Sequence, residues 1–468
     1  MTKIKFGTDG WRAIIDEDFT PENVTRVIQA FSDLYTASPN KLVYVGFDRR
    51  RKSDSTAKLV ARILATNGFN VRLSSDFCPT PCVSWLVKTG KALAGVMVTA
   101  SHNPSTWNGI KFKESYGGAA SPEYTSQIEK RISENEDKPI QDYPSYEALV
   151  AEKKIQIFDP RSTYVAHLKK FIDVEAINAR GYKIAVDPLF GAGTNFIQEV
   201  LGVPVMQIHD EADVSFGGLN PEPIEKNLVA FKDFIIKNKA DVGLATDGDA
   251  DRIGALDAHG EFVNSHQIFA LLLKHHVTHR KLSGTVVKSV SATQWIDRLC
   301  AKYGLEVVET PIGFKYISQE LLKRDALMGG EESGGISLRE HVHERDGVLN
   351  GLLLVEMMAI HGKSLEGLLE DLYSEFGRFC FDRHDYHLTD AKVTEVRDLM
   401  ARKEICEVGG KAVTSYNMLD GTKIFFEDES WLLVRASGTE PLLRVYSEAP
   451  TRERVKELLS FAKDYLKI

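Results

Sequence analysis

The sequence is poor in cysteine and contains no long apolar run. Its 468 residues include only five cysteines, an odd number at wide spacings: Cys78, Cys82, Cys300, Cys380 and Cys406. This pattern argues against a disulfide framework and is typical of reduced thiols. No apolar stretch reaches the about 18 residues that cross a membrane, and the N-terminus lacks an apolar signal core. We therefore expect a cytoplasmic protein that makes no membrane contact.

An excess of positive charge is also absent. Lysine and arginine number 58 against 66 acidic residues, which gives a net charge of −8 and a pI of about 6.0. A broad nucleic-acid surface is therefore not expected, although an anionic substrate could bind where positive charge is focused locally. The Walker A motif and the acyl-transfer motif G-x-S-x-G are missing too, which disfavours a P-loop kinase and a serine hydrolase.

Short apolar runs alternate with helical patterns over most of the chain. Residues 41–48 predict a strand, and residues 56–68 predict a helix that ends at Gly68. The alternation recurs twice more and indicates α/β units. The end of the chain instead predicts two strands around a tight loop and a closing amphipathic helix. We predict four domains around a central cleft: three related α/β domains with mixed sheets at 1–146, 147–255 and 256–374, and a smaller α+β domain at 375–468.

Polar, glycine-rich clusters follow predicted strands in each of these domains. They are TASHNP (99–104), TDGDADR (246–252), GGEESGG (329–335) and RASGTEP (435–441). Ligands of open α/β sheets bind beyond the carboxyl ends of the strands. The clusters therefore predict one shared cleft to which every domain contributes.

The TDGDADR cluster places three carboxylates at alternate positions, Asp247, Asp249 and Asp251. Carboxylates this close repel one another unless a cation lies among them, and Mg²⁺ favours such oxygen ligands. A solvated acidic turn is the alternative. An EF-hand is excluded because Arg252 and Ala258 stand where that loop needs glycine and glutamate. Asp251 also departs from the haloacid-dehalogenase pattern, which wants threonine or valine at that position.

The other clusters indicate recognition of phosphate and sugar. RASGTEP offers a guanidinium, hydroxyls and backbone amides that could bind a phosphate, and Arg444 could add a second guanidinium. A plain hairpin turn fits the segment as well. In GGEESGG, acidic and hydroxyl groups could bind sugar hydroxyls, or the segment could be a flexible acidic loop. His341 and His343 follow it and could be acid/base groups or surface residues. We expect the histidines of KHHVTHR and the basic residues 49–52 to be solvated.

Ser101 stands alone in TASHNP and is by default a helix-capping serine. That expectation changes because the same chain also carries clusters that suit a metal ion, a phosphate group and a sugar. A serine placed with them could carry a phosphoryl group.

Taken in order, FGTDGWRA, TASHNP, DGDADR, GGEESGG and RASGTEP resemble the motifs of the α-D-phosphohexomutases, the phosphoglucomutase/phosphomannomutase superfamily. The match runs from Phe6 to about Tyr446. The resemblance implies a heart-shaped molecule of four domains. It also implies that Ser101 is phosphorylated and binds Mg²⁺ together with the three aspartates.

Further roles follow from the same resemblance. Sugar hydroxyls would be read by Glu331 and Ser333, with Lys315 from the loop TPIGFKY. The substrate's non-reacting phosphate would be held by Arg435, Ser437, Gly438, Thr439 and Arg444. Arg12 and Arg252 would line the cleft, and the catalytic base would be Lys111 or a histidine, His102 or His341.

The implied reaction interconverts hexose 1-phosphate and hexose 6-phosphate through a hexose 1,6-bisphosphate, with glucose 1,6-bisphosphate as activator. We expect glucose as the favoured sugar, mannose as possible, a monomer or dimer, and closure of the C-terminal domain over the cleft. A phosphoglucosamine mutase is the nearest alternative, although Trp11, Glu332 and Gly335 argue against it. A phosphosugar phosphatase and a non-catalytic phosphosugar-binding protein are further alternatives.

Overall fold

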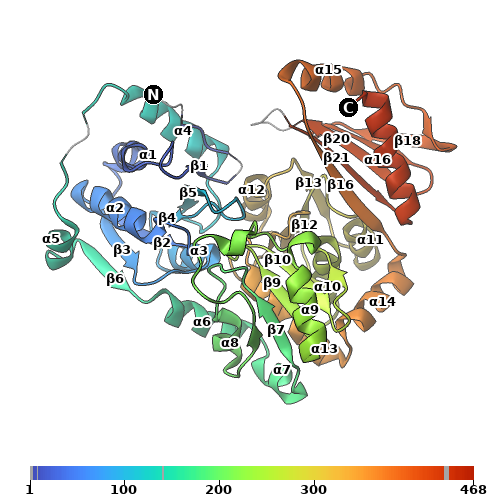
Figure 1. Cartoon of the computed structure of the whole chain (residues 1–468), viewed down its shortest axis with the longest axis horizontal. Coiled ribbons are helices and arrows are strands. Elements are labelled where there is room, and N and C mark those ends of the chain that lie inside the picture. The colour runs from blue at the N-terminus through green and yellow to red at the C-terminus, as the bar shows by residue number, and fades with distance from the viewer. Residues whose placement is uncertain (1–3, 8, 140–141, 437–441) are drawn as a thin grey trace.

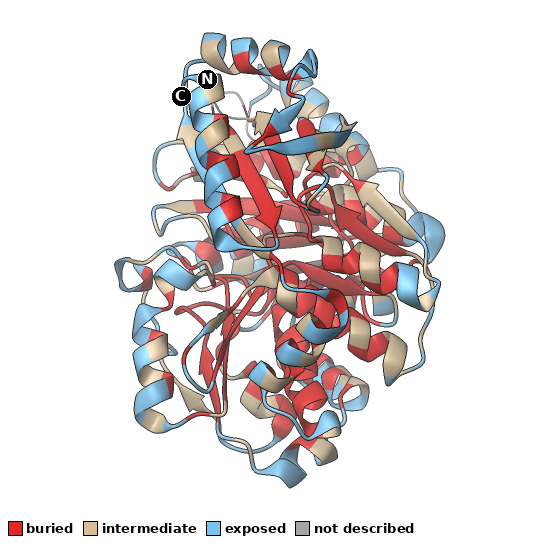
Figure 2. Cartoon of the chain, turned by 90° about the vertical axis from the view of Figure 1, so that its right-hand side faces the viewer, coloured by how far each residue is buried: buried red, intermediate tan, exposed pale blue. Residues whose placement is uncertain are grey.

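The computed structural model describes residues 4–7, 9–139, 142–436 and 442–468. Within these ranges the chain forms four β-sheets with helices packed on them. The N-terminal and C-terminal units lie on opposite sides of the molecule, and the two middle units lie between them (Figure 1). The strands are largely buried, whereas most helices show one buried and one exposed side (Figure 2).

The first unit is a six-stranded mixed sheet in the order β1-β5-β4-β2-β3-β6. Its central strand β4 is buried at all five residues, and it pairs in parallel with β2 and antiparallel with β5. A continuous apolar run is typical of a strand that is covered on both faces. Ser101 follows the carboxyl end of this strand. The elements are β1 (Trp11–Ile14), α1 (Pro21–Tyr35), β2 (Leu42–Phe47), α2 (Ser53–Thr66), β3 (Asn70–Ser74), α3 (Thr80–Thr89), β4 (Ala94–Val98), β5 (Trp107–Glu114), α4 (Pro122–Glu134), α5 (Tyr146–Ala151) and β6 (Ile155–Phe158).

The second unit is a five-stranded sheet in the order β11-β10-β9-β7-β8. Strand β9 is buried at all five residues, runs directly into Asp247, and is followed by its antiparallel partner β10. The elements are α6 (Pro160–Phe171), α7 (Val174–Arg180), β7 (Ile184–Asp187), α8 (Phe196–Leu201), β8 (Met206–Gln207), the 3₁₀ turns η1 (Phe216–Gly218) and η2 (Glu225–Asn227), α9 (Val229–Asn238), β9 (Val242–Thr246), β10 (Ile253–Asp257) and β11 (Phe262–Val263).

The third unit is a four-stranded sheet in the order β13-β12-β14-β15, and Glu331 follows β14. Its helix α13 is buried along almost its whole length, because it packs against β9 and β10 of the second sheet as well as α10 and α14. The two middle units therefore share one core. The elements are α10 (Ser265–Thr278), β12 (Val286–Ser289), α11 (Gln294–Tyr303), β13 (Val307–Thr310), α12 (Phe314–Arg324), β14 (Met328–Gly330), β15 (Ile336–Leu338), α13 (Gly347–His361) and α14 (Leu365–Phe376).

The fourth unit is an antiparallel sheet in the order β16-β21-β20-β19-β18-β17. Alternation along β20 separates its two faces: Leu432 and Val434 join the core under the helices, whereas Trp431 and Leu433 pack against Val290 and Ile312 of the third unit. The elements are β16 (Cys380–His387), α15 (Asp390–Ala401), β17 (Glu407–Val408), β18 (Lys411–Asn417), β19 (Thr422–Phe426), β20 (Trp431–Ala436), β21 (Leu442–Ala449) and α16 (Arg452–Leu466).

The structure confirms three α/β units and an α+β unit but moves the predicted boundaries. The boundary at 146 is wrong for the first sheet, because β6 pairs in parallel with β3 and extends this sheet to Phe158. The boundary at 255 cuts through β10, and β11 extends the second sheet to Val263. The boundary at 374 falls inside the last turn of α14. The first limit depends on the pairing of β6 with the distant β3, whereas the second depends on pairing of β10 with its chain neighbours β9 and β11.

No single helix among the described residues is long and apolar enough to cross a membrane. Helices α13 and α14 meet the length and composition criteria only as a pair, and they are bent by 81° relative to each other.

Candidate active site

Ser101 lies in a strained loop that its neighbours hold in place. Its φ of 53° is in the left-handed region, which is unfavourable for a residue with a side chain. The Ser101 N–H donates to Thr99 Oγ1 at 2.8 Å, and the Thr99 hydroxyl donates to Asp48 at 2.6 Å. Arg50 Nη2 donates to the Ser101 carbonyl oxygen at 2.5 Å. Backbone strain of this kind persists only where the surroundings fix it, and it concentrates at functional sites.

Arg50 is the anchor of this loop, and the prediction that residues 49–52 are solvated is wrong for it. Arg50 is only 3% exposed to solvent. Besides Ser101, the guanidinium donates to the carbonyl oxygens of Asn103, Pro104 and Trp107 and lies 3.3 Å from Asp48. Burial is tolerated because loop carbonyls accept from both terminal nitrogens and the Asp48 carboxylate balances the charge, although Nε is buried without a hydrogen-bond partner among the described residues.

The three aspartates of TDGDADR form a buried cluster next to Ser101. One ligand oxygen from each of Asp247, Asp249 and Asp251 lies within 4.8 Å of the others. All three residues are fully buried, which contradicts a solvated acidic turn. Ser101 Oγ donates to Asp247 Oδ2 at 2.9 Å. Burial, followed by the charges of Asp251 and Asp249, raises the pKa of Asp247 well above its usual value.

The donor set fits a hard divalent cation. Among the described residues, Asp249 Oδ1 and Asp251 Oδ1 are buried and have no hydrogen-bond partner. Buried carboxylate oxygens without partners are costly unless a cation binds them. Oxygen-only ligands at this spacing suit Mg²⁺. The second oxygen of Asp249 accepts from the Thr80 hydroxyl at 2.5 Å, which orients this carboxylate.

Lys111 is an ion-pair partner of the cluster. Its Nζ lies 2.7 Å from Asp9, 2.8 Å from Asp249 and 3.0 Å from Asp251. Burial alone would lower the pKa of Lys111, but the three carboxylates outweigh it and raise the pKa above its usual value. The ammonium is therefore protonated in this structure, which disfavours Lys111 as the base that accepts a proton.

Arg345 and Asp9 complete the cluster, although the sequence did not identify either as a site residue. Arg345 is 3% exposed and contacts Asp9, Asp251 at 2.7 Å and Glu331 at 3.3 Å. Asp9, in turn, contacts Lys111. Asp9 belongs to FGTDGWRA, and Arg345 follows His341 and His343 in the segment after GGEESGG. Only the charge of Asp9 and Arg345 and their positions in the sequence could have indicated that they are site residues.

The two candidate histidines occupy different places. His102 Nδ1 lies 3.5 Å from Ser101 Oγ. Burial, Arg252 and Arg12 lower the pKa of His102 well below its usual value, which favours the neutral ring but also makes it a weaker base. His341 lies apart from Ser101, and its catalytic role stays a prediction. Its Nδ1 is paired with His167 at 2.8 Å and its Nε2 with Asp346 at 2.7 Å, so both nitrogens are occupied in a buried network.

Arg12 and Arg252 lie close to the serine and aspartate loops. Arg12 Nη1 donates to Asn103 Oδ1 at 2.6 Å, two residues beyond Ser101. Arg252 Nη1 lies 3.0 Å from Glu222, and its Nε lies 3.9 Å from Asp247 and from Asp251. The site thus gathers positive charge around its acidic cluster.

The predicted sugar-binding residues reach the site through Arg345. Glu331 Oε1 accepts from the Ser333 hydroxyl at 2.6 Å and from Arg345 Nη1 at 3.3 Å. Glu332 instead accepts from Ser291 Oγ at 2.6 Å. Lys315 is partly buried beside the Tyr316 ring, and burial lowers the pKa of Lys315.

The predicted phosphate-binding arginines face each other across two strands. Arg435 on β20 is the register partner of Arg444 on β21. Arg435 Nε contacts Asp420 at 2.8 Å, and Arg444 Nε lies 3.8 Å from Asp385. Ser437, Gly438 and Thr439 lie outside the described residues. In the sequence, the strands that carry the two arginines directly precede and follow this predicted phosphate loop.

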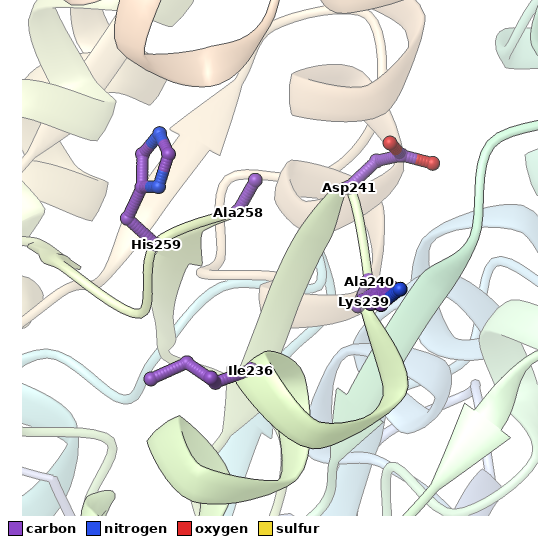
Figure 3. A pocket seen from close by; sticks show the side chains of 6 residues that line it. All are labelled: Ile236, Lys239, Ala240, Asp241, Ala258 and His259. Atoms are coloured by element: carbon purple, nitrogen blue, oxygen red, sulfur yellow. The ribbon is translucent and has the colours of Figure 1, made fainter.

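Two other features lie apart from this site. An open hollow of about 390 Å³ is lined by Ile236, Lys239, Ala240, Asp241, Ala258 and His259, none of them a predicted site residue. Its polar side chains stand apart and do not converge on one point (Figure 3). The prediction of a solvated face for KHHVTHR is wrong for His275 and His276, which are each only 1% exposed, and correct for His279, which is exposed. His275 and His276 are buried because α13 packs against α10.

Comparison with known proteins identifies all four units. Models of phosphoglucomutase/phosphomannomutase domains match residues 3–139 (domain I), 162–260 (domain II), 264–376 (domain III) and 388–463 (the C-terminal domain).

Curated relatives and a solved structure agree with these matches. A phosphoglucomutase/phosphomannomutase of Thermococcus kodakarensis is 33% identical over 97% of this chain and 96% of its own. A phosphoglucosamine/phosphogalactosamine mutase of Sulfurisphaera tokodaii is 30% identical, covering 98% of each chain. A crystal structure from Thermus thermophilus that carries a provisional phosphomannomutase name superposes with a TM-score of 0.87, at 33% identity and over 100% of both chains. This chain therefore belongs to the phosphoglucomutase/phosphomannomutase family, the α-D-phosphohexomutases, and is a mutase.

Proposed function

We propose that this mutase interconverts glucose 1-phosphate and glucose 6-phosphate, accepts mannose phosphates as well, and works through a phosphoserine at Ser101. The observation that carries this proposal is the hydrogen bond of 2.9 Å between Ser101 Oγ and Asp247 in the buried acidic cluster. A hydroxyl held in a strained loop against a cation-type site suits phosphoryl transfer, which depends chiefly on positioning and charge neutralisation.

Asp247, Asp249 and Asp251 would hold Mg²⁺, with an oxygen on Ser101 as a further ligand. When bound, Mg²⁺ would neutralise charge on the phosphoryl group in transfer. Arg12 and Arg252 would bind the equatorial phosphate oxygens beside it. His102, whose Nδ1 lies 3.5 Å from Ser101 Oγ, is the group that would take the proton of the attacking sugar hydroxyl.

The transfer would run in two balanced halves. In the first, the bond between phosphorus and Ser101 Oγ breaks, a bond to the free sugar hydroxyl forms, the hydroxyl proton moves to the base, and Ser101 Oγ takes up a proton to become a hydroxyl. The resulting hexose 1,6-bisphosphate reverses its orientation, and its other phosphoryl group returns to Ser101. The second half reverses these proton movements. Arg435 and Arg444 would hold whichever phosphate is not in transfer, and added glucose 1,6-bisphosphate would phosphorylate an empty Ser101.

A glucosamine phosphate is the second candidate substrate. It is favoured by the phosphoglucosamine/phosphogalactosamine mutase that is 30% identical to this chain. A phosphatase reaction, in which water replaces the sugar hydroxyl as the acceptor, is the further alternative.

Phosphorus NMR would test the proposal. Glucose, mannose and glucosamine 1-phosphates would be supplied separately with Mg²⁺ and a trace of glucose 1,6-bisphosphate. We expect a 6-phosphate signal that grows fastest with glucose, no growth with Ser101→Ala, and normal growth with Ser105→Ala as the control from the same loop. Fastest turnover of glucosamine 1-phosphate would reassign the sugar, release of inorganic phosphate alone would make the protein a hydrolase, and full activity of Ser101→Ala would refute the phosphoserine.

A further inference from the structure

Asp420 connects the C-terminal unit to a loop of the third unit through a single oxygen atom. Its Oδ2 accepts from Arg435 Nε at 2.8 Å and from the backbone N–H of Ile312 at 2.9 Å. Arg435 is the proposed phosphate-binding residue, and Ile312 lies in the segment Thr310–Tyr316, which also carries Lys315. One carboxylate thus bonds to both halves of the predicted substrate site.

The turn that bears Asp420 is shaped for this position. It joins β18 to β19, and its Gly421 has a φ of +87°. A Cβ on Gly421 would lie 2.4 Å from the carbonyl oxygen of Val434 and 3.0 Å from the Cα of Arg435. The turn therefore packs directly against the strand that carries Arg435. At the start of the turn, Asn417 Nδ2 donates to Glu309 at 2.8 Å, which ties it to β13.

The surroundings strengthen these hydrogen bonds. The side chains of Arg435 and Asp420 are only 11% and 21% exposed. Ile312 is part of an apolar cluster with Val290, Trp431, Leu433 and Tyr446, which seals the interface between the two units. Charged hydrogen bonds beside such a dry interface are stronger than bonds in open solvent.

The bonded loop also reaches the acidic cluster. Phe314 follows Ile312 by two residues, and its ring lies 5.0 Å from the guanidinium carbon of Arg345. Arg345 in turn contacts Asp251 at 2.7 Å. A continuous set of contacts therefore runs from the phosphate-binding arginine to the candidate metal ligands.

We propose that Asp420 is a positioning residue that couples the grip on the non-reacting phosphate to the Thr310–Tyr316 loop. Binding of that phosphate by Arg435 fixes Asp420, and through the Ile312 amide it fixes the loop beside the sugar. This inference rests on the proposed function, because it assigns the phosphate to Arg435. It adds a residue that touches neither substrate nor metal.

Steady-state kinetics of Asp420→Ala and Asp420→Asn provide the first test. We expect Asp420→Ala to raise KM for glucose 1-phosphate about tenfold, the effect of losing one charge-assisted bond, with a smaller change in kcat. Asp420→Asn keeps an oxygen acceptor for Ile312 but loses the charge, so its KM should be intermediate. Asp398→Ala, on the exposed side of α15, is the matched control and should behave as the wild type. A loss of kcat at unchanged KM, or an equal effect of Asp398→Ala, would overturn the proposal.

Amide hydrogen exchange provides the second test, and it does not require turnover. We expect the peptide that covers residues 310–316 to exchange faster in Asp420→Ala than in the wild type, with little change in Asp420→Asn. Adding glucose 6-phosphate should slow this exchange in the wild type and not in Asp420→Ala. Equal slowing in both would refute the coupling. Absence of mutase activity in the wild type would refute the proposed function instead, and the exchange of the ligand-free variants would still decide whether Asp420 holds the loop.

Discussion

The carbonyl oxygen of Ser101 lies so close to Gly248 that a Cβ on this glycine would come within 2.5 Å of it. Ser101 belongs to the first sheet and Gly248 to the second. The contact therefore sets the distance between the reactive serine and the aspartates on either side of Gly248. Glycine is required here for close approach, because any side chain would force the two loops apart.

We expect Gly248→Ala to lower kcat/KM by about 100-fold, since a displacement of about 1 Å is enough to misplace reacting groups. The fold should survive, because the strain is local to two loops. Activity measurements and calorimetry would check this. Gly367→Ala in α14, where a Cβ would meet its nearest neighbour at an ordinary 3.4 Å, is the control and should be fully active. Normal activity of Gly248→Ala would show that the spacing is not critical.

Replacing Arg345 by methionine should destabilise the protein strongly. Asp9, Asp251 and Glu331 would keep their negative charges in a buried place without this partner. Removal of one side of a buried ion pair costs about 3–5 kcal/mol. Thermal unfolding would measure the effect. Arg324→Met removes an exposed arginine paired with Glu320 and should cost about 0–1 kcal/mol. Similar melting temperatures for the two variants would contradict the central place of Arg345.

Mg²⁺ should stabilise the metal-stripped protein. Because the aspartate cluster has buried oxygens without partners, a bound cation relieves both repulsion and desolvation. At 100 times its Kd, a ligand that binds only the folded state adds about 2.7 kcal/mol. The rise in Tm on adding Mg²⁺ after chelation would report this. Asp251→Asn should reduce the rise and Asp233→Asn, on the exposed side of α9, should not. An equal response of both variants would place the cation elsewhere.

His276 should make stability depend on pH. Burial, followed by the charges of Arg280 and His275, lowers the pKa of His276 to about 3, whereas an unfolded histidine titrates near about 6.5. Between these values the unfolded chain binds a proton that the folded chain does not, so stability falls as pH drops from about 6.5 towards 3.

His276→Leu should therefore lose less Tm than the wild type between pH 7.5 and pH 5. Calorimetry at the two pH values gives the comparison, and His384→Leu, on an exposed strand, is the control. Parallel losses of Tm in the wild type and His276→Leu would show that other groups dominate.

Local sequence patterns located the strand ends and their polar clusters, because an apolar run and the turn that follows it are encoded by neighbouring residues. Ser101, Asp247 and Glu331 were found in this way. Arg50 and the histidines of α10 were misjudged, because their burial depends on segments far away in the chain. Arg50 is buried by the carbonyls of residues 101–107 and α10 by α13.

The surroundings of His341 could not be predicted for a different reason. Its place after GGEESGG suggested a catalytic acid or base. The position of a residue in a motif, however, does not show which way its ring points. His167 of α6 and Asp346 occupy both ring nitrogens. A partner contributed by another unit could not be read from the motif itself.

The buried cluster of Asp9, Lys111, Asp251 and Arg345 also bears on how the chain is made. These residues enter the growing polypeptide far apart, and Arg345 is the last of them. Until it emerges from the ribosome, Asp9 and Asp251 have Lys111 as a counter-charge but lack Arg345. We therefore expect this buried cluster to be completed only once about three quarters of the chain has been translated, a length set by the position of Arg345 in the 468 residues.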